Sequence, residues 1–213
     1  MTISGINRVL MACGGSLLLC FAAGAQENQK FTFDIQGGFT QSAGRSADRV
    51  DLGWNTGLGA GYNFNQHVGA VVRFDFMSNG INSMTLNNLG FPGGDIHVWD
   101  LSLDPIIHLP RRGPVDMYVT GGGGLYHYRQ EFTAPTIATA IGFDPFFGFY
   151  QAGIPATQVL QAYEVYRPGF DVGAGFALGS KFHGKFFAEA RWRRVLFENG
   201  HYDMIPVSFG FRW

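Results

Sequence analysis

The chain has 213 residues, of which 46% are hydrophobic and only 15% are charged, and its formal net charge is −1. This length suits a single domain, and the near-zero charge excludes the basic surface that nucleic-acid-binding proteins use. The 31 glycines and 21 phenylalanines disfavour helices and favour strands. We therefore expect one all-β domain with no nucleic-acid partner.

The N-terminal segment has the composition of a secretory signal. Arg8 supplies positive charge, a mostly apolar run follows it, and small residues precede a polar one at Ala25-Gln26. We predict a cleaved signal peptide over residues 1–25, with cleavage between Ala25 and Gln26. The mature domain would then cover residues 26–213.

Both cysteines of the chain, Cys13 and Cys20, lie in this predicted signal segment. The mature protein is therefore expected to form no disulfide. The alternative is lipoprotein processing, because the three residues before Cys13, Leu10-Met11-Ala12, resemble a lipobox. The apolar run in front of Cys13 is too short to favour that alternative.

Apolar and polar residues alternate with period two through most of the remaining chain, and no apolar run reaches the roughly 18 residues that a spanning helix requires. Eight alternating segments can be recognised, over residues 31–40, 50–64, 68–77, 98–107, 115–125, 170–182, 186–193 and 205–213. Strands of about ten residues in even number are typical of outer-membrane barrels. The predicted fold is an eight-stranded antiparallel up-and-down transmembrane β-barrel.

The connections between these segments alternate in length. Those over residues 65–67, 110–114 and 183–185 are short, and those over residues 42–49, 78–94, 129–162 and 196–203 are long. Membrane barrels place short turns in the periplasm and long loops outside. A soluble lipocalin-like barrel is the alternative, but it would be apolar inside and would not carry Phe and Trp along its outer face.

Pairing the strands across the short turns tests this interpretation. If Phe64 lies opposite Val68, then Arg73 faces Gly59 and Asp75 faces Gly57. The same assumption at the other two turns pairs Glu189 with Gly179, Arg191 with Ala177 and Asp100 with Gly124. An eight-stranded barrel is only just wide enough for side chains to fill it, so long charged chains need small residues opposite them.

The inward positions carry charges of both signs. The predicted lumen network consists of Arg73, Asp75, Asp100, Asp104, Glu189, Arg191, Arg193 and Arg212, with Asp34, Asp51, Asp171 and Lys181 also expected to point inward. Because an unpaired buried ion costs several kcal/mol, we expect these charges to pair and to plug the lumen. The alternative is that they line a narrow ion path.

Three segments resemble the OmpA/OmpX-like superfamily of small outer-membrane barrels. They are Phe186-Phe187-Ala188-Glu189-Ala190-Arg191-Trp192, the ending Val207-Ser208-Phe209-Gly210-Phe211-Arg212-Trp213, and the glycine-rich Tyr118-Val119-Thr120-Gly121-Gly122-Gly123-Gly124-Leu125. The resemblance implies that Phe209, Phe211 and Trp213 form the signal read by the outer-membrane insertion machinery. It also implies contact with outer-membrane lipid and lipopolysaccharide in a Gram-negative-type bacterium.

An enzymatic role needs a nucleophile within reach of a base. His97, His127 and His201 are expected near the outer side, Ser102 inside the barrel and Ser83 in a loop, and no His-x-Ser pair like that of lipid A deacylases occurs. No two histidines have a spacing typical of metal ligands. We expect no catalytic residue, no metal site and no cofactor.

One predicted outer loop is unusually aromatic. It contains Phe143, Phe146, Phe147, Phe149 and Tyr150. Exposed apolar patches mark interaction surfaces, so this loop is the candidate site for a surface or envelope partner. The alternative is that the loop packs on itself or extends the hairpin above the membrane.

Together these features favour a non-enzymatic outer-membrane barrel with a structural or surface-interaction, adhesion-like role. The alternative is a narrow porin, or a channel for small apolar solutes as in OmpW-like proteins. Inward apolar residues that line a pocket would favour the channel, whereas inward Gly, Asp and Arg favour a plug.

Overall fold

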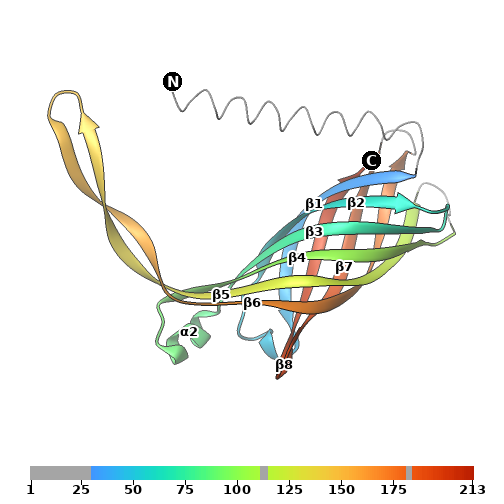
Figure 1. The fold of residues 1–213 in the computed structure, drawn as a ribbon, viewed down its shortest axis with the longest axis horizontal. Helices are drawn as coiled ribbons and strands as arrows, with labels where there is room; N and C mark the ends of the chain where they lie inside the picture. The colour runs from blue at the N-terminus through green and yellow to red at the C-terminus, as the bar shows by residue number, and fades with distance from the viewer. Residues whose placement is uncertain (1–29, 111–114, 181–183) are drawn as a thin grey trace.

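The computed structural model describes residues 30–110, 115–180 and 184–213, and Figure 1 shows its fold. The described residues form the strands β1 (Phe31–Ala43), β2 (Gly53–Asn63), β3 (Val68–Gly80), β4 (Gly93–His108), β5 (Val115–Asp144), β6 (Gly148–Ser180), β7 (Gly184–Phe197) and β8 (Gly200–Arg212), with a 3₁₀-helix η1 (Gly44–Ser46) and a helix α2 (Ser83–Leu89). Each strand pairs antiparallel with the next, and β8 pairs with β1, so the sheet closes. The predicted eight-stranded antiparallel barrel is confirmed. Within the described ranges, no helix is long and apolar enough to cross a membrane.

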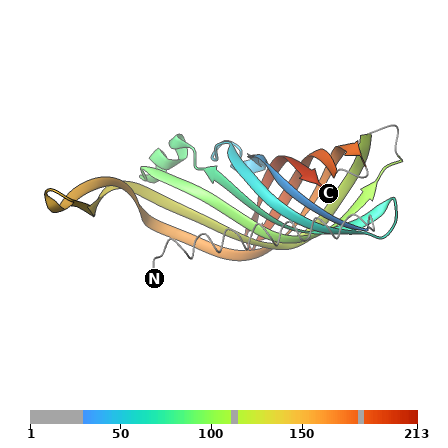
Figure 2. The same cartoon turned by 90° about the horizontal axis from the view of Figure 1, so that it is seen from above.

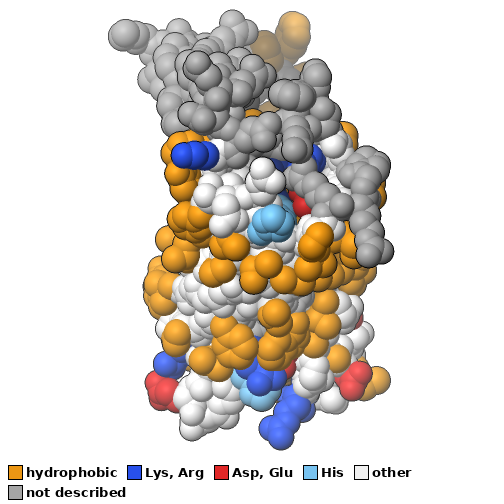
Figure 3. Space-filling model, turned by 90° about the vertical axis from the view of Figure 1, so that its right-hand side faces the viewer, with side chains coloured by type: hydrophobic (Ala, Val, Ile, Leu, Met, Phe, Trp, Pro, Cys, Tyr) orange, Lys and Arg blue, Asp and Glu red, His pale blue; other side chains and the backbone are white. Residues whose placement is uncertain are grey.

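The barrel is apolar outside and polar inside. Outward residues such as Leu58, Leu103 and Phe209 remain more than half exposed, whereas the inward charges are buried. Figure 3 shows hydrophobic side chains over much of one side of the barrel, with charged side chains at its lower margin. This arrangement is the inverse of a soluble barrel, as the sequence alternation predicted.

The register agrees with the prediction at one short turn and differs at the other two. Arg73 lies opposite Gly59 and Asp75 opposite Gly57, as expected. Between β4 and β5 the register is shifted by two residues, so the pairing of Asp100 with Gly124 was wrong and Asp100 instead faces Tyr126.

Between β6 and β7 the predicted pairs were also wrong. Strand β6 ends at Ser180 and β7 already begins at Gly184, earlier than expected, and Gly184 with φ of +86° has the left-handed conformation that favours glycine. Glu189 consequently faces Gly175 instead of Gly179, and Arg191 faces Gly173 instead of Ala177. At this turn the physical reasoning still holds, because Glu189 and Arg191 each lie opposite a glycine.

One predicted inward charge lies outside the barrel, and other predictions lie outside the described residues. Asp51 is exposed in the connection before β2, where its carboxylate accepts a hydrogen bond from Asn82 Nδ2 at 3.0 Å. It was expected inside because the alternation was traced back to Val50, whereas the strand begins at Gly53. Lys181, the signal peptide and the cleavage site at Ala25-Gln26 lie outside the described residues.

The connection between β5 and β6 differs most from the expectation. Residues 129–162 were predicted as a loop, with an extended hairpin as the alternative. The structure agrees with the alternative, because the two strands continue as a paired ribbon to the turn at residues 145–147. Figures 1 and 2 show this ribbon projecting from the barrel in both views. Both of its faces are exposed, so its sequence does not alternate between apolar and polar, and alternation could not reveal it.

Candidate functional site

The inward charges meet in a single layer across the middle of the barrel. Arg191 of β7 reaches three carboxylates: Glu189 through Nε, Asp104 at 2.5 Å and Asp171 at 2.8 Å through Nη1. Its side chain is only 2% exposed. One guanidinium thus joins carboxylates from three strands, β4, β6 and β7.

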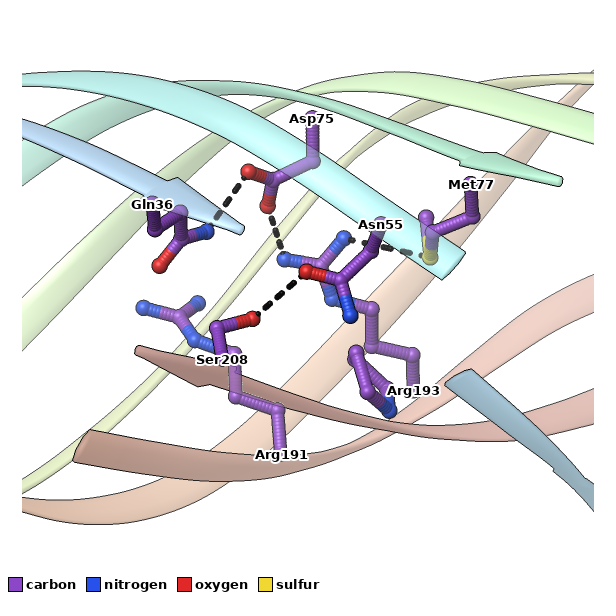
Figure 4. Close-up of a pocket in the computed structure, with 8 residues that line it drawn as sticks. Gln36, Asn55, Asp75, Met77, Arg191, Arg193 and Ser208 are labelled. Carbon is purple, nitrogen blue, oxygen red and sulfur yellow. Dashed lines mark hydrogen bonds and ion pairs between the residues drawn. The ribbon is translucent and has the colours of Figure 1, made fainter. Parts of the chain in front are cut away.

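A second arginine forms the next part of this layer. Arg193 Nη1 donates to Asp100 of β4 at 2.7 Å, and its Nη2 bonds Asp75 of β3. Figure 4 shows Asp75, Arg193 and Gln36 pointing toward one another inside the barrel. Gln36 donates to Asp75 at 2.8 Å and accepts from Arg73 at 2.7 Å, so it connects the two halves of the network.

The remaining pairs extend the layer to the closing strand. Arg73 lies 3.5 Å from Glu189 and 3.7 Å from Asp34, and Asp34 in turn lies 3.4 Å from Arg212 of β8. The Arg212 guanidinium also lies over the Tyr118 ring, 5.1 Å from its centroid. All eight residues predicted for the lumen network are therefore brought into one connected set. Gln36 was missed because it is uncharged, although its inward position follows from the alternation of β1.

Apolar side chains cover this charged layer on both sides. Toward the short turns, the cluster consists of Val71, Ile106, Tyr118, Ala177 and Phe187. Toward the long loops, a larger cluster includes Met77, Val98, Tyr126, Val195, Tyr202 and Met204 from the strands, with Val50, Ile81 and Leu86 from the outer connections. The inward apolar residues therefore pack against one another as a core.

These layers leave the lumen closed at the level of the charges. Arg73, Asp100 and Asp104 are 0% exposed. The space lined by Gln36, Asn55 and neighbouring residues, drawn in Figure 4, has no room for a water-sized molecule. Chemically, the arrangement can hold charges in place. Within the described residues, it leaves no water-wide path along the barrel at this level.

A belt of paired charges lies on the outer face beyond the tryptophans at the long-loop end. Arg194 lies over the Trp192 ring, 4.6 Å from its centroid, and donates two hydrogen bonds of 2.7 Å to Asp203. These hydrogen bonds hold the pKa of Asp203 below its ordinary value. Arg129 similarly lies 3.0 Å from Glu164. Outward charges are costly in hydrocarbon, so this belt marks the upper limit of the membrane-facing band.

The histidines and serines considered for catalysis are not arranged as a nucleophile and base. Ser102 is inside the barrel and donates to Asp104 at 3.2 Å, while Ser83 begins α2. His97 and His127 face outward near Glu131 and Glu164, and His201 lies near Asp203. Within the described ranges, no group of three or more His, Cys, Asp or Glu residues could hold a metal ion.

The C-terminal aromatics lie along the seam that closes the barrel. Phe209 is exposed on the outer face, and Phe211 stacks on Trp213 with ring centroids 6.0 Å apart. The Trp213 backbone exchanges two hydrogen bonds of 2.9 Å with Phe33 of β1. Their role as an insertion signal stays a prediction.

The aromatic residues of the predicted outer loop gather at the tip of the β5–β6 ribbon. Phe143 and Phe149 are directly paired across the ribbon, with ring centroids 5.1 Å apart and planes at 60°. Phe146 and Phe147 lie in the turn and are each 90% exposed, and Tyr150 follows at 53%. The structure thus places all five predicted residues at one end of the molecule.

A closed antiparallel barrel with an apolar outer band and a charged, filled interior is the architecture of a transmembrane β-barrel of the outer-membrane type. Comparison with known protein families supports this assignment to outer-membrane barrels. The family described as outer membrane protein beta-barrel domain matches residues 14–212, and the chain belongs to this family. The protein is therefore an outer-membrane protein of Gram-negative bacteria.

Solved structures with similar folds include several small barrels. The neisserial surface protein A is 14% identical, with a TM-score of 0.56, over 85% of this chain and 95% of that one. Ail, the attachment invasion locus protein of Yersinia pestis, solved with a heparin analogue, is 18% identical with a TM-score of 0.47, over 86% and 99%. OprG of Pseudomonas aeruginosa is 12% identical with a TM-score of 0.47, over 86% and 96%. No curated protein sequence matches the chain. At 14% identity, the likeness to the neisserial surface protein A shows the fold alone.

Proposed function

We propose that this protein is a sealed, non-enzymatic outer-membrane barrel whose β5–β6 ribbon has a surface-interaction, adhesion-like role. The observation that supports this proposal is the ribbon itself. It extends beyond the last pair of β4 with β5, Gly93 with Thr133, and carries the most exposed aromatic residues of the described chain at its tip.

The interior supports a structural role instead of transport. The charged layer is buried and paired, and apolar clusters cover it on both sides. The inward apolar residues would favour an apolar channel if they lined a pocket, but they are buried and pack against one another, with Met77 and Val98 only 1% and 2% exposed. The interior therefore favours the plug over the channel.

The structure shows where the ribbon can be removed without cutting the barrel. Thr133 pairs with Val159, and the residues between them pair only with each other. Replacing residues 134–158 with a two-residue Asn-Gly turn would therefore keep every pair of β4 with β5 and of β6 with β7.

The test compares bacteria that display the wild-type protein, the ribbon deletion, or a Met84→Ser variant. Met84 is a matched control, because it is 73% exposed and lies in α2 on another long connection. We expect the deletion to lower attachment to host-cell monolayers at least tenfold, to the level of bacteria without the protein, and the control to leave it unchanged. A heat-dependent gel shift measures the amount of folded barrel in each. Attachment that persists without the ribbon, at equal amounts of folded barrel, would contradict the proposal.

A further inference from the structure

The ribbon beyond the barrel is almost free of charge. Between Arg129 and Arg167 there is no lysine or arginine, and between residues 133 and 163 the only charged residue is Asp144. Protein-binding surfaces carry polar rims and charged groups that select their partner. A surface with a single carboxylate and no cation offers little electrostatic selectivity, and it limits the cost of placing charges near an apolar medium.

The tip adds a cluster of rings to this nearly uncharged ribbon. Phe143, Phe146, Phe147 and Phe149 are 64%, 90%, 90% and 79% exposed. With 150–250 Å² for a phenylalanine side chain, they expose about 600 Å² of apolar surface, at the upper limit for monomeric soluble proteins. Tyr150, with its polar hydroxyl, lies next to them on the strand. Exposed Phe rings with a neighbouring Tyr are the composition of segments that lie in a membrane interface.

The tip is convex, because it is a narrow turn at the end of two strands. Gly148, with φ of +77°, closes the turn, and Pro145 has no backbone N–H that would need a partner. A convex tip with four phenylalanines and a single charged residue, Asp144, fits the interface of a fluid membrane better than a shaped protein pocket. The prolines Pro135 and Pro155 lie on the two edges of the ribbon, where they hinder pairing with a further strand.

The base of the ribbon is anchored at the long-connection end of the barrel. Phe132 stacks on Phe91, with ring centroids 4.3 Å apart, and the register shifts between Phe132 and Thr133, where Leu160 is the extra residue of a bulge. The charged belt with Arg129 and Glu164 separates this base from the membrane-facing band. The twelve residues from Thr133 to Asp144 extend about 40 Å at 3.3 Å per residue.

From these observations we propose that the ribbon tip inserts its phenylalanines into the interface of an apposed phospholipid bilayer, such as the membrane of another cell. This inference rests on the proposed surface role and names its partner class. Insertion is shallow, because the free edges of the ribbon keep backbone groups that need water or headgroups. Since the ribbon carries no basic residue, binding does not depend on anionic lipid.

The test uses the complete barrel, one copy per nanodisc of phosphatidylcholine, mixed with vesicles of phosphatidylcholine with brominated acyl chains. Co-flotation measures the bound fraction. We expect Phe146→Ser with Phe147→Ser to lower the bound fraction at least tenfold. The control, Met84→Ser with Leu89→Ser, removes two exposed apolar residues from α2 and should change it less than twofold.

A second readout reports insertion directly. In a Phe147→Trp variant, the introduced indole should be quenched by the brominated vesicles, while the native tryptophans of the barrel stay in unbrominated nanodisc lipid. Binding should be equal at low and high salt, and should not increase when anionic lipid is added to the vesicles.

The outcomes separate this inference from the proposed function. Absence of quenching, equal flotation of the tip variant and wild type, or flotation that requires anionic lipid would overturn the lipid assignment. Nanodiscs that associate through the tip without vesicles would also overturn it, in favour of a second copy. If the ribbon deletion still abolishes attachment to cells in any of these cases, the surface role stands; if attachment persists, the surface role itself fails.

Discussion

Replacing Arg191 with alanine tests whether the charged layer is a sealed structural element. Arg191 is the common partner of Glu189, Asp104 and Asp171, whose side chains are at most 1% exposed. Removing the guanidinium leaves these carboxylates without their shared counter-charge. The network of six acids and four arginines would then have only three arginines.

The expected loss of unfolding free energy follows from the burial of these carboxylates. Breaking a buried ion pair by removing one partner costs about 3–5 kcal/mol, because the remaining charge is not compensated. Equilibrium unfolding in urea, followed by tryptophan fluorescence and the heat-dependent gel shift, measures the change in the free energy of unfolding. Arg167→Ala is the matched control, because Arg167 pairs with Glu198 at 2.9 Å but the two side chains are 24% and 76% exposed. We expect no measurable loss for this exposed pair.

A second substitution distinguishes lost charge pairing from lost packing. Asp171→Asn in the Arg191→Ala background removes one of the uncompensated charges, so it should restore part of the lost stability. The coupling between the two changes should lie at about 0.5–3 kcal/mol in a double-mutant cycle. If Arg191→Ala costs no more than Arg167→Ala, the layer is solvated and the argument for a sealed lumen is refuted.

Three further outcomes follow from the geometry. In planar bilayers the refolded wild-type protein should show no stable single-channel openings, because apolar layers cover the charges on both sides; regular openings would contradict the plug. Gly122→Ala should cost about 1–3 kcal/mol in urea unfolding, because its added methyl group would overlap the Leu103 carbonyl oxygen. Gly80→Ala, with nothing within 4 Å of the added carbon, is its neutral control. Because the Arg194 hydrogen bonds lower the pKa of Asp203 from its ordinary 3.8, their stabilisation should be complete above about pH 4 and be lost as pH falls below it. The urea midpoint of the wild type should therefore fall further between pH 6 and pH 2.5 than that of Asp203→Asn, and equal falls would contradict this assignment.

The barrel could be predicted because lipid and the narrow interior require different residue types at neighbouring positions of each strand. Lipid outside and a narrow interior force apolar and polar or small residues to alternate, and this pattern marks Leu58 as outward and Gly57 as inward without further information. The same pattern identifies the inward charges. Their convergence could be expected because an eight-stranded barrel has no room for unpaired long side chains.

The details that the sequence did not reveal depend on turns and on contacts between distant strands. The shift of Glu189 from Gly179 to Gly175 depends on where β6 ends and β7 begins, Ser180 and Gly184, which alternation does not encode. The apolar cover toward the long loops was missed for a different reason. Leu86 belongs to a helix of seven residues within a connection that was predicted as a loop, and its burial depends on packing against β4.

The ribbon could be given only as the alternative of an extended hairpin, because the apolar/polar alternation that identifies the barrel ends where lipid and lumen end. Beyond Thr133, β5 has no β4 neighbour, no lipid on one face and no lumen on the other, so nothing requires its two faces to differ. What distinguishes this segment is its composition. Residues 133–163 contain one charged residue, Asp144, and phenylalanine is concentrated around the turn. An isolated two-stranded ribbon is only marginally stable in water, and rings that stay 64–90% exposed bury little apolar surface there. The rings at Phe146 and Phe147 are therefore best explained by an environment that the free protein does not provide, and it is at this tip that a partner should be sought.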